Sequence, residues 1–204
     1  MGTLRELFDT HGCDKGYKHA YERVYEPALK EVKEDQLNFL EIGTYRGEST
    51  EAFVEYLPNS TIYTIDTFQR IAPEDVQALT YERVKWIKGD SQSFGITKQI
   101  REEWGDIKFD FIIDDAQHDP RANMDTFKVF KQFLKSDGVY FIEDVWLLHK
   151  SGPEKNPWTA ARQERYNMLA HNNFLSELEK GGQLRTHDLR VGGKPDSAIL
   201  EWRW

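Results

Sequence analysis

Short apolar runs of strand length recur along the chain and alternate with amphipathic segments. The runs are rich in β-branched and aromatic residues and are bounded by turn residues, which is typical of strands. They span residues 38–42, 61–65, 84–88, 109–113 and 139–142. Residues 48–57 and 123–134 instead carry apolar side chains at helical spacing. The second of these has a stripe made by Met124, Phe127, Phe130, Phe133 and Leu134. Because parallel strands need crossover connections, which helices supply, the pattern predicts an α/β fold with a doubly wound, mostly parallel sheet.

The rhythm changes after the fifth run. A loop over residues 151–157 and a long helix over residues 159–179 are expected there, followed by two strand-like runs at 183–191 and 197–203. The linker between these runs, residues 192–196, is short and rich in turn residues, which favours an antiparallel pair at one edge of the sheet. The sheet would then have seven strands.

The length of 204 residues fits one ordinary domain with a continuous core. Within it we expect an N-terminal helical segment (1–36), a central ligand-binding core (37–146) and a C-terminal part with a loop, a helix and edge strands (147–204). The start at Met1 and Gly2 is compatible with a domain excised from a longer protein.

The composition limits the partners. A formal net charge of −8 opposes binding to a nucleic-acid backbone or to an anionic membrane, so we expect neither as a partner. No segment approaches the ~20 apolar residues that cross a bilayer, and the first residues lack the apolar run of a signal peptide. The single cysteine, Cys13, forms no internal disulfide. We therefore expect a soluble, cytoplasmic protein that acts on a neutral or cationic small molecule, either as a monomer or as a homo-oligomer.

Candidate chemistry gathers where the strand-like runs end, because ligands of open parallel sheets bind at the carboxyl ends of the strands. The first run ends in the glycine turn EIGTYRGES, residues 41–49. Its G-x-x-x-G spacing departs from the dinucleotide fingerprint and disfavours a nicotinamide cofactor. The second run ends in Asp66, 23 residues after Gly43. This is close to the offset of ~20 residues at which an acid accepts hydrogen bonds from a ribose. Together they indicate an adenosine-containing ligand, although the turn alone is equally typical of an ordinary strand-to-helix connection.

The third run ends in Gly89, Asp90 and Ser91. A carboxylate and neighbouring backbone at this place are suited to meet an adenine edge. The alternative is that Asp90 caps the following helix.

The fourth and fifth runs end in acidic pairs, Asp114 with Asp115 and Glu143 with Asp144. Four carboxylates that converge near a cleft repel one another unless a positive charge lies among them, which predicts a divalent cation. Oxygen donors favour Mg²⁺, Mn²⁺ or Ca²⁺ over zinc. The alternative is that these acids only cap helices and bind loop backbone.

His118 stands on a loop three residues after Asp115. An ordinary pKa of about 6.5 suits an imidazole to accept a proton at neutral pH, so His118 is the candidate general base. The alternative is a surface histidine without a role.

In chain order the strand ends read LEIGTYRGES, YTIDTF, IKGDSQS, FIIDDAQHD and FIEDVW. This series resembles class I S-adenosylmethionine-dependent methyltransferases. The D-D-x-x-H stretch and the later E-D pair are similar to metal-dependent sugar O-methyltransferases of the mycinamicin and macrocin type, as is the N-terminal stretch DKGYKHAY. The resemblance covers roughly residues 14–146. It departs at Ala116 and Gln117, where the family often has Gly-Ser, which puts the positioning of the acceptor in doubt.

The resemblance implies a Rossmann-like methyltransferase fold that uses S-adenosylmethionine and a divalent metal, most simply Mg²⁺. The implied cofactor contacts are Glu41, Gly43, Thr44, Tyr45, Gly47, Ser49, Asp66, Asp90, Ser91 and Asp114. The implied metal ligands are Asp115, Glu143 and Asp144, of which Asp115 is also a catalytic residue together with the base His118. Lys15, His19 and Tyr21 would form a lid.

The implied acceptor is a small molecule or glycan with vicinal hydroxyls, such as a rhamnose glycoside. Three alternatives stay open at this point: a catechol acceptor, a non-catalytic S-adenosylmethionine-binding module and, more distantly, a dehydrogenase.

Overall fold

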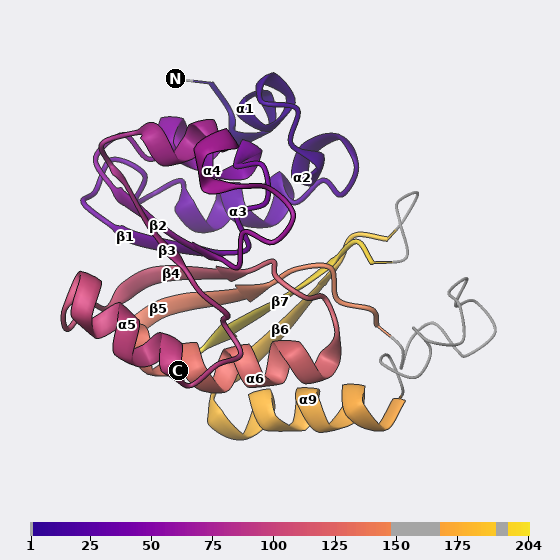
Figure 1. Cartoon of the computed structure of the whole chain (residues 1–204). Coiled ribbons are helices and arrows are strands. Elements are labelled where there is room, and N and C mark those ends of the chain that lie inside the picture. The colour runs from indigo at the N-terminus through magenta and orange to yellow at the C-terminus, as the bar shows by residue number, and fades with distance from the viewer. Residues whose placement is uncertain (1, 148–167, 191–195) are drawn as a thin grey trace.

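Seven strands form one sheet in the order β3-β2-β1-β4-β5-β7-β6 (Figure 1). The computed structural model describes residues 2–147, 168–190 and 196–204. Its strands are β1 (Asn38–Ile42), β2 (Thr61–Asp66), β3 (Val84–Lys88), β4 (Phe109–Asp114), β5 (Leu134–Ile142), β6 (Gln183–Asp188) and β7 (Ala198–Arg203). The first five pair in parallel, whereas β7 runs antiparallel to both β5 and β6. This confirms the predicted doubly wound sheet with an antiparallel C-terminal pair.

Helices cover both faces of the sheet. On one face lie α1 (Leu4–Thr10), α2 (Asp14–Tyr17), α3 (Glu22–Leu29) and α4 (Glu48–Tyr56), and on the other lie α5 (Gly95–Trp104), α6 (Pro120–Phe130) and α9 (Met168–Gly181) (Figure 1). Three short 3₁₀ helices complete the described elements: η1 (Pro73–Asp75), η2 (Gln77–Thr80) and η3 (Lys131–Phe133). None of the helices in the described part of the chain has the length and apolar character needed to cross a membrane.

Alternate side chains of the strands pack into two separate hydrophobic cores, one on each face of the sheet. Phe39 and Phe111 pack with the N-terminal helices, whereas their neighbours Leu40 and Ile112 pack with α5 and α6. Period-2 alternation sends successive side chains to opposite faces. Because both faces are covered by helices, both sets of side chains are apolar and the runs read as continuous.

Several predicted boundaries shift in the structure. The helical stripe assigned to residues 123–134 starts earlier, at Pro120, because the side chain of Asp119 accepts hydrogen bonds from the backbone of Arg121 and Ala122 and so caps α6. Leu134 was expected to end this helix but is instead the first residue of β5. An apolar side chain fits a helix stripe and a buried strand start equally well, so periodicity alone did not separate the two.

Two further expectations differ in detail. The connection between β2 and β3 contains only the 3₁₀ helices η1 and η2, so the crossover there is not an α-helix. The helix expected over residues 159–179 is seen as α9, whose predicted first residues lie outside the described part, as do the loop 151–157 and residues 192–195 of the linker.

Glu201 of β7 contacts His187 of the neighbouring edge strand β6, and the contribution of this contact to stability can be tested. Hydrogen bonding from His187 lowers the pKa of this carboxyl from 4.5 to about 2, against burial and with help from Arg203. A depressed pKa stabilises the fold above pH 4.5, and this contribution is lost as the pH falls toward 2. Because the group is partly exposed, Glu201→Gln is expected to lower the free energy of unfolding by about 1 kcal/mol at pH 7. In urea unfolding, the difference in free energy of unfolding between wild type and Glu201→Gln should be smaller at pH 3 than at pH 7. An equal difference at both pH values would contradict the stabilising role of the hydrogen bond between His187 and Glu201.

Candidate functional site

The carboxyl ends of the parallel strands meet along one edge of the sheet. In the register, Ile42 of β1 lies opposite both Ile65 of β2 and Asp114 of β4, and Asp114 lies opposite Ile142 of β5. The residues that follow these positions therefore emerge side by side. They open into a cavity with a volume of about 770 Å³.

Most of the predicted site residues line this cavity. They are Gly43, Thr44, Tyr45, Ser49, Asp66, Asp90, Ser91, Asp115, His118, Glu143 and Asp144. Lys15, His19 and Tyr21 from the N-terminal segment also belong to its wall. Three predicted cofactor contacts, Glu41, Gly47 and Asp114, do not, and their roles toward a cofactor stay predictions.

Gly43 brings two strand ends into direct contact. Its φ is +99°, and a Cβ atom built there would overlap the backbone carbonyl oxygen of Asp115. Glycine is therefore required both by the backbone conformation and by the close approach of the neighbouring loop. The glycine turn and the acidic loop after β4 are packed as one unit.

Asp66 holds the same turn from the other side. One carboxylate oxygen accepts hydrogen bonds from the backbone N–H of Thr44 (2.9 Å) and Tyr45 (3.0 Å), and the other accepts one from Phe68 (2.7 Å). A carboxylate has about four lone-pair sites, so one remains for a ribose hydroxyl. The geometry fits the predicted ribose contact and adds a structural role that the sequence did not suggest.

Glu41 lies beneath the cavity rather than in its wall. It is fully buried and accepts hydrogen bonds from the hydroxyls of Ser49 (2.5 Å) and Thr50 (2.6 Å), which lie in the first turn of α4. Burial raises the pKa of Glu41, while Lys15 and the two hydroxyls oppose the rise. Glu41 thus ties β1 to α4.

The other two residues outside the wall are also engaged in packing. Gly47 has a φ of +86° and abuts Ala78. Asp114 is buried and accepts a hydrogen bond from the side-chain amide of Asn123 at 3.2 Å. Burial raises the pKa of Asp114 to about 7.

At the third strand end, Asp90 and Ser91 face the cavity as predicted. Asp90 also accepts a hydrogen bond from the backbone N–H of Gln92 at 2.9 Å, within the loop. The alternative that Asp90 caps the following helix is wrong, because α5 has Phe94 as its N-cap. Ser91 contacts the hydroxyl of Thr126 at 3.2 Å.

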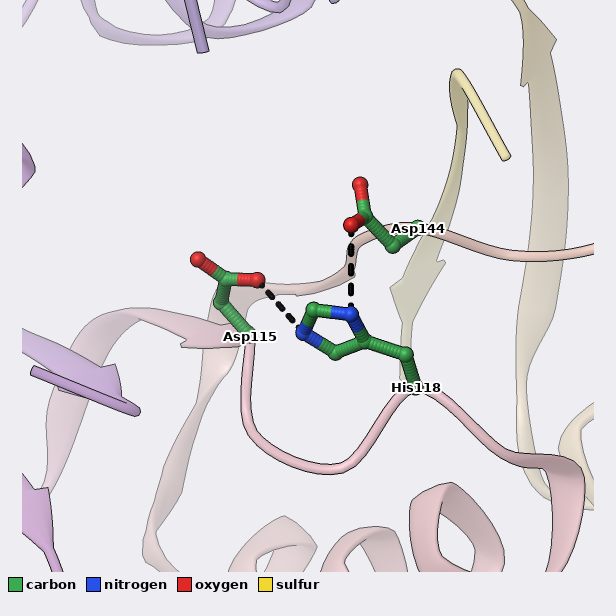
Figure 2. A group of neighbouring side chains, drawn as sticks. All are labelled: Asp115, His118 and Asp144. Carbon is green, nitrogen blue, oxygen red and sulfur yellow. Dashed lines mark ion pairs between the residues drawn. The ribbon is translucent and has the colours of Figure 1, made fainter. Parts of the chain in front are cut away.

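His118 lies between two carboxylates on the loop after β4 (Figure 2). Its Nε2 is 2.9 Å from Asp115 Oδ1 and its Nδ1 is 3.1 Å from Asp144 Oδ2. Both His118 and Asp144 have a φ of +53°, a conformation that costs free energy for residues other than glycine. Strained backbone of this kind clusters at functional sites, so the placement of these two side chains points to a constrained role.

The three residues have strongly interacting charges. Burial alone would lower the pKa of His118, but the carboxylates of Asp115 and Asp144 outweigh it and raise that pKa well above the usual 6.5. In turn, burial would raise the pKa of Asp115, yet Lys15 and His118 hold it below its usual range. The pKa of Asp144 is likewise low, because His118 outweighs the effect of burial.

A buried lysine from the N-terminal segment completes the acidic cluster, which we define as Glu41, Asp115, Glu143 and Asp144. The ammonium of Lys15 contacts Asp115 Oδ2 and lies 2.6 Å from Glu143 Oε2. The hydroxyl of Tyr25 donates to the second oxygen of Glu143, and that of Tyr21 donates to Asp144 Oδ1 at 2.5 Å.

The sequence named Lys15 and Tyr21 only as parts of a lid, and it missed Tyr25. A signal was present, since Tyr21 and Tyr25 are four residues apart and share one face of a helix. The acidic partners lie more than a hundred positions away along the chain, so the pattern could not identify them.

Within the part of the chain that the structure describes, one group of side chains could hold a divalent cation, and it combines two carboxylates of the acidic cluster with His118. Ligand atoms of Asp115, His118 and Asp144 all lie within 4.8 Å of one another. Nε2 of His118 is buried, and although Asp115 is near, the two are not aligned as a hydrogen bond. Two carboxylates and an imidazole suit several divalent ions. Glu143, the third predicted ligand, instead has its two oxygens at Lys15 and Tyr25, so its role as a ligand stays a prediction.

The cavity also fits a ligand of the size of S-adenosylmethionine, since pockets for such molecules span about 300–1,000 Å³. The glycine turn, Asp66 and Asp90 lie in one wall and the acidic cluster borders another part of it. One cavity therefore joins the predicted cofactor contacts to the candidate metal centre.

The chain is similar in sequence to known methyltransferases. The chain is 27% identical over 159 residues to 8-demethyl-8-(2-methoxy-alpha-L-rhamnosyl)-tetracenomycin-C 3'-O-methyltransferase of Streptomyces olivaceus, covering 74% of this chain and 39% of that protein. It is 24% identical over 157 residues to mycinamicin VI 2''-O-methyltransferase of Micromonospora griseorubida, covering 73% of this chain and 37% of that protein. The chain thus spans about two fifths of the length of these relatives.

A similar fold occurs in a solved structure, that of MycE methyltransferase in complex with Mg, S-adenosylhomocysteine and mycinamycin VI. The TM-score is 0.70 at 20% identity, over 99% of this chain and 54% of that one. Residues 40–145 of the chain match the family model described as a methyltransferase domain. These residues contain the glycine turn, Asp66 and both acidic pairs, and they make up more than half of the chain. The chain belongs to this methyltransferase domain family.

Proposed function

We propose that the chain is the catalytic domain of an S-adenosylmethionine-dependent O-methyltransferase that methylates a hydroxyl of a sugar in a small-molecule glycoside. One observation carries the proposal. The candidate metal-binding group of Asp115, His118 and Asp144 lines the same cavity as the glycine turn and Asp66. The names of the two relatives, both O-methyltransferases and one of a rhamnosyl compound, support an acceptor of this class.

The cofactor would bind against the turn after β1. Asp66, already fixed by three backbone N–H groups, would accept a hydrogen bond from the ribose, and Asp90 and Ser91 would face the adenine. S-adenosylmethionine supplies an electrophilic methyl group, so the protein's task is to align and activate the acceptor oxygen.

Asp115 and Asp144 would hold a divalent cation, with Glu143 as the predicted third carboxylate. Such a cation supplies Lewis-acid chemistry toward a hydroxyl or a vicinal diol. His118 lines the cavity from the loop after β4 and would accept the proton of the reacting hydroxyl. The carboxylates of Asp115 and Asp144, which raise the pKa of His118, would then be shared with the cation, and this would favour the neutral imidazole that a base requires.

The test begins with calorimetric titration of S-adenosylmethionine into the purified chain. Turnover is then measured on a panel of rhamnosides, other glycosides and catechols with Mg²⁺ or with a chelator. We expect cofactor binding and turnover of a glycoside that the chelator abolishes and Mg²⁺ restores. Turnover of catechols but of no glycoside would show that the acceptor is a catechol and not a sugar. Binding without turnover of any acceptor would favour a non-catalytic module, and no binding of S-adenosylmethionine would overturn the proposal.

A further inference from the structure

The hydroxyl of Tyr21 contacts both the backbone and the side chain of Asp144. Tyr21 directly precedes α3 and is completely buried. Its hydroxyl donates to Asp144 Oδ1 at 2.5 Å and accepts from the backbone N–H of Asp144 at 3.2 Å. The same hydroxyl lies 3.2 Å from the carbonyl oxygen of Asp196, just before β7. A hydroxyl has one proton, and the carboxylate is the nearer of the two acceptors, so the proton is directed mainly to Asp144.

The backbone after β5 depends on this contact at one point. The N–H of Glu143 donates to the carbonyl oxygen of Asp114 at 3.0 Å, and that of Val145 donates to Ala198 at 3.1 Å. Between these two bonds to neighbouring strand segments lies Asp144, whose N–H donates to Tyr21. Its φ of +53° is costly for a residue other than glycine, and such a conformation persists where the surroundings fix it. Tyr21 therefore helps to hold the strained residue of this turn.

The same hydroxyl determines how the carboxylate of Asp144 is turned. Oδ1 is engaged by Tyr21, whereas Oδ2 lies 3.1 Å from Nδ1 of His118. Asp144 thereby belongs to the candidate metal-binding group with Asp115 and His118. One oxygen is held from behind while the other points to the place where a cation would bind.

Tyr21 is itself held by its neighbours. Its ring stacks on that of His19, with centroids 4.9 Å apart and an interplanar angle of 25°, and it meets the edge of Tyr25 at 6.4 Å. Nδ1 of His19 is 2.8 Å from the hydroxyl of Ser197, and both residues are buried. The position of the Tyr21 hydroxyl is therefore fixed by packing before any ligand binds.

We propose that Tyr21, held in place by His19, is a positioning residue of the metal centre. Its hydroxyl keeps Asp144 in the left-handed backbone conformation and keeps one carboxylate oxygen turned toward the cation. This inference rests on the metal-assisted function proposed above and leaves its ligands unchanged, since Tyr21 contacts a ligand and not the cation. Groups that hydrogen-bond to metal ligands typically contribute about 10–100-fold to metal affinity or activity.

The experiment compares Mn²⁺ binding, followed by electron paramagnetic resonance, in the wild-type chain and in Tyr21→Phe. Phenylalanine keeps the ring that stacks on His19 and deletes only the hydroxyl. The Kd for Mn²⁺ is expected to rise by about 10–100-fold, because Asp144 loses the group that orients it. The Kd for S-adenosylmethionine, measured by calorimetry, is expected to stay unchanged, because the predicted cofactor contacts Asp66 and Asp90 lie in another part of the cavity wall.

Tyr56→Phe is the matched control. Tyr56 is also a buried tyrosine, but it is the last residue of α4 and does not line the cavity. This variant should leave the affinities for Mn²⁺ and for S-adenosylmethionine unchanged.

A second variant serves if Tyr21→Phe does not fold, as judged by circular dichroism. His19→Gln keeps a polar group beside Ser197 but removes the ring that stacks on Tyr21. Loss of this aromatic contact is expected to weaken Mn²⁺ binding by about threefold or more, with S-adenosylmethionine binding unchanged. In that case, wild-type Mn²⁺ affinity in His19→Gln would overturn the inference.

The outcomes separate this inference from the proposed function. Equal Mn²⁺ affinity in the wild-type chain and in Tyr21→Phe would overturn the positioning role and leave the proposed function intact. A parallel loss of affinity for Mn²⁺ and for S-adenosylmethionine would give Tyr21 a general structural role and would overturn it as well. No Mn²⁺ binding to the wild-type chain would overturn the metal-assisted function, and this inference with it.

Discussion

Replacing His118 with alanine is expected to reduce kcat by about 10²–10⁴-fold while binding of S-adenosylmethionine persists, since this is the usual contribution of a general base. A sugar hydroxyl is a poor nucleophile at neutral pH and needs help to lose its proton. His118 lies between two carboxylates of the acidic cluster, with its ring nitrogens 2.9 Å from Asp115 and 3.1 Å from Asp144. Single-turnover kinetics with saturating cofactor would measure the chemical step directly.

The matched control is His187→Gln. His187 also pairs with a carboxylate, Glu201 at 2.7 Å, but it lies in the edge strand β6 and not in the cavity wall. This variant is expected to lose stability without a change in kcat. Undiminished turnover in His118→Ala would remove His118 from the mechanism. A fall in turnover that tracks a large loss of Mn²⁺ affinity, and that is restored by excess metal, would instead make His118 a ligand.

The sheet, and the edge of it at which the cavity opens, could be predicted because both depend on local sequence patterns. Apolar runs such as residues 109–113 specify strands, and parallel pairing brings the strand ends together without any further information. Gly43 and Asp66 were identified in this way, and the structure places them against each other through the backbone of Thr44.

What the sequence could not predict depends on contacts between distant segments. The charge argument correctly required a positive group among the carboxylates, but one such group is Lys15, a hundred positions before Asp115. Likewise, Glu41 reads as a strand-end acid, yet the hydroxyls of Ser49 and Thr50 bind it beneath the cavity. Side-chain direction at a strand end follows from the packing of neighbouring segments, which a single sequence does not encode locally.

A substitution in the glycine turn after β1 is expected to affect both stability and turnover strongly. Gly43→Ala is expected to destabilise the fold and to reduce turnover by about 10²-fold, with weaker binding of S-adenosylmethionine. The φ of +99° is unfavourable for alanine, and the added Cβ would overlap the carbonyl oxygen of Asp115. Relief of that overlap must move the loop that carries Asp115 and His118 away from β1. Thermal unfolding, calorimetry with the cofactor and kinetics would follow the three effects separately.

Gly105→Ala separates the strain of the backbone from the collision. Gly105 has a φ of +72°, but a Cβ there meets nothing within 4 Å. It is therefore expected to show only the backbone cost of about 1–3 kcal/mol, with cofactor binding and turnover unchanged. If Gly43→Ala lost no more stability than Gly105→Ala and retained full turnover, the close packing of the turn against Asp115 would not be needed. The glycine turn and the acidic loop would then act independently, because the contact that joins them at Gly43 would carry no functional cost when broken.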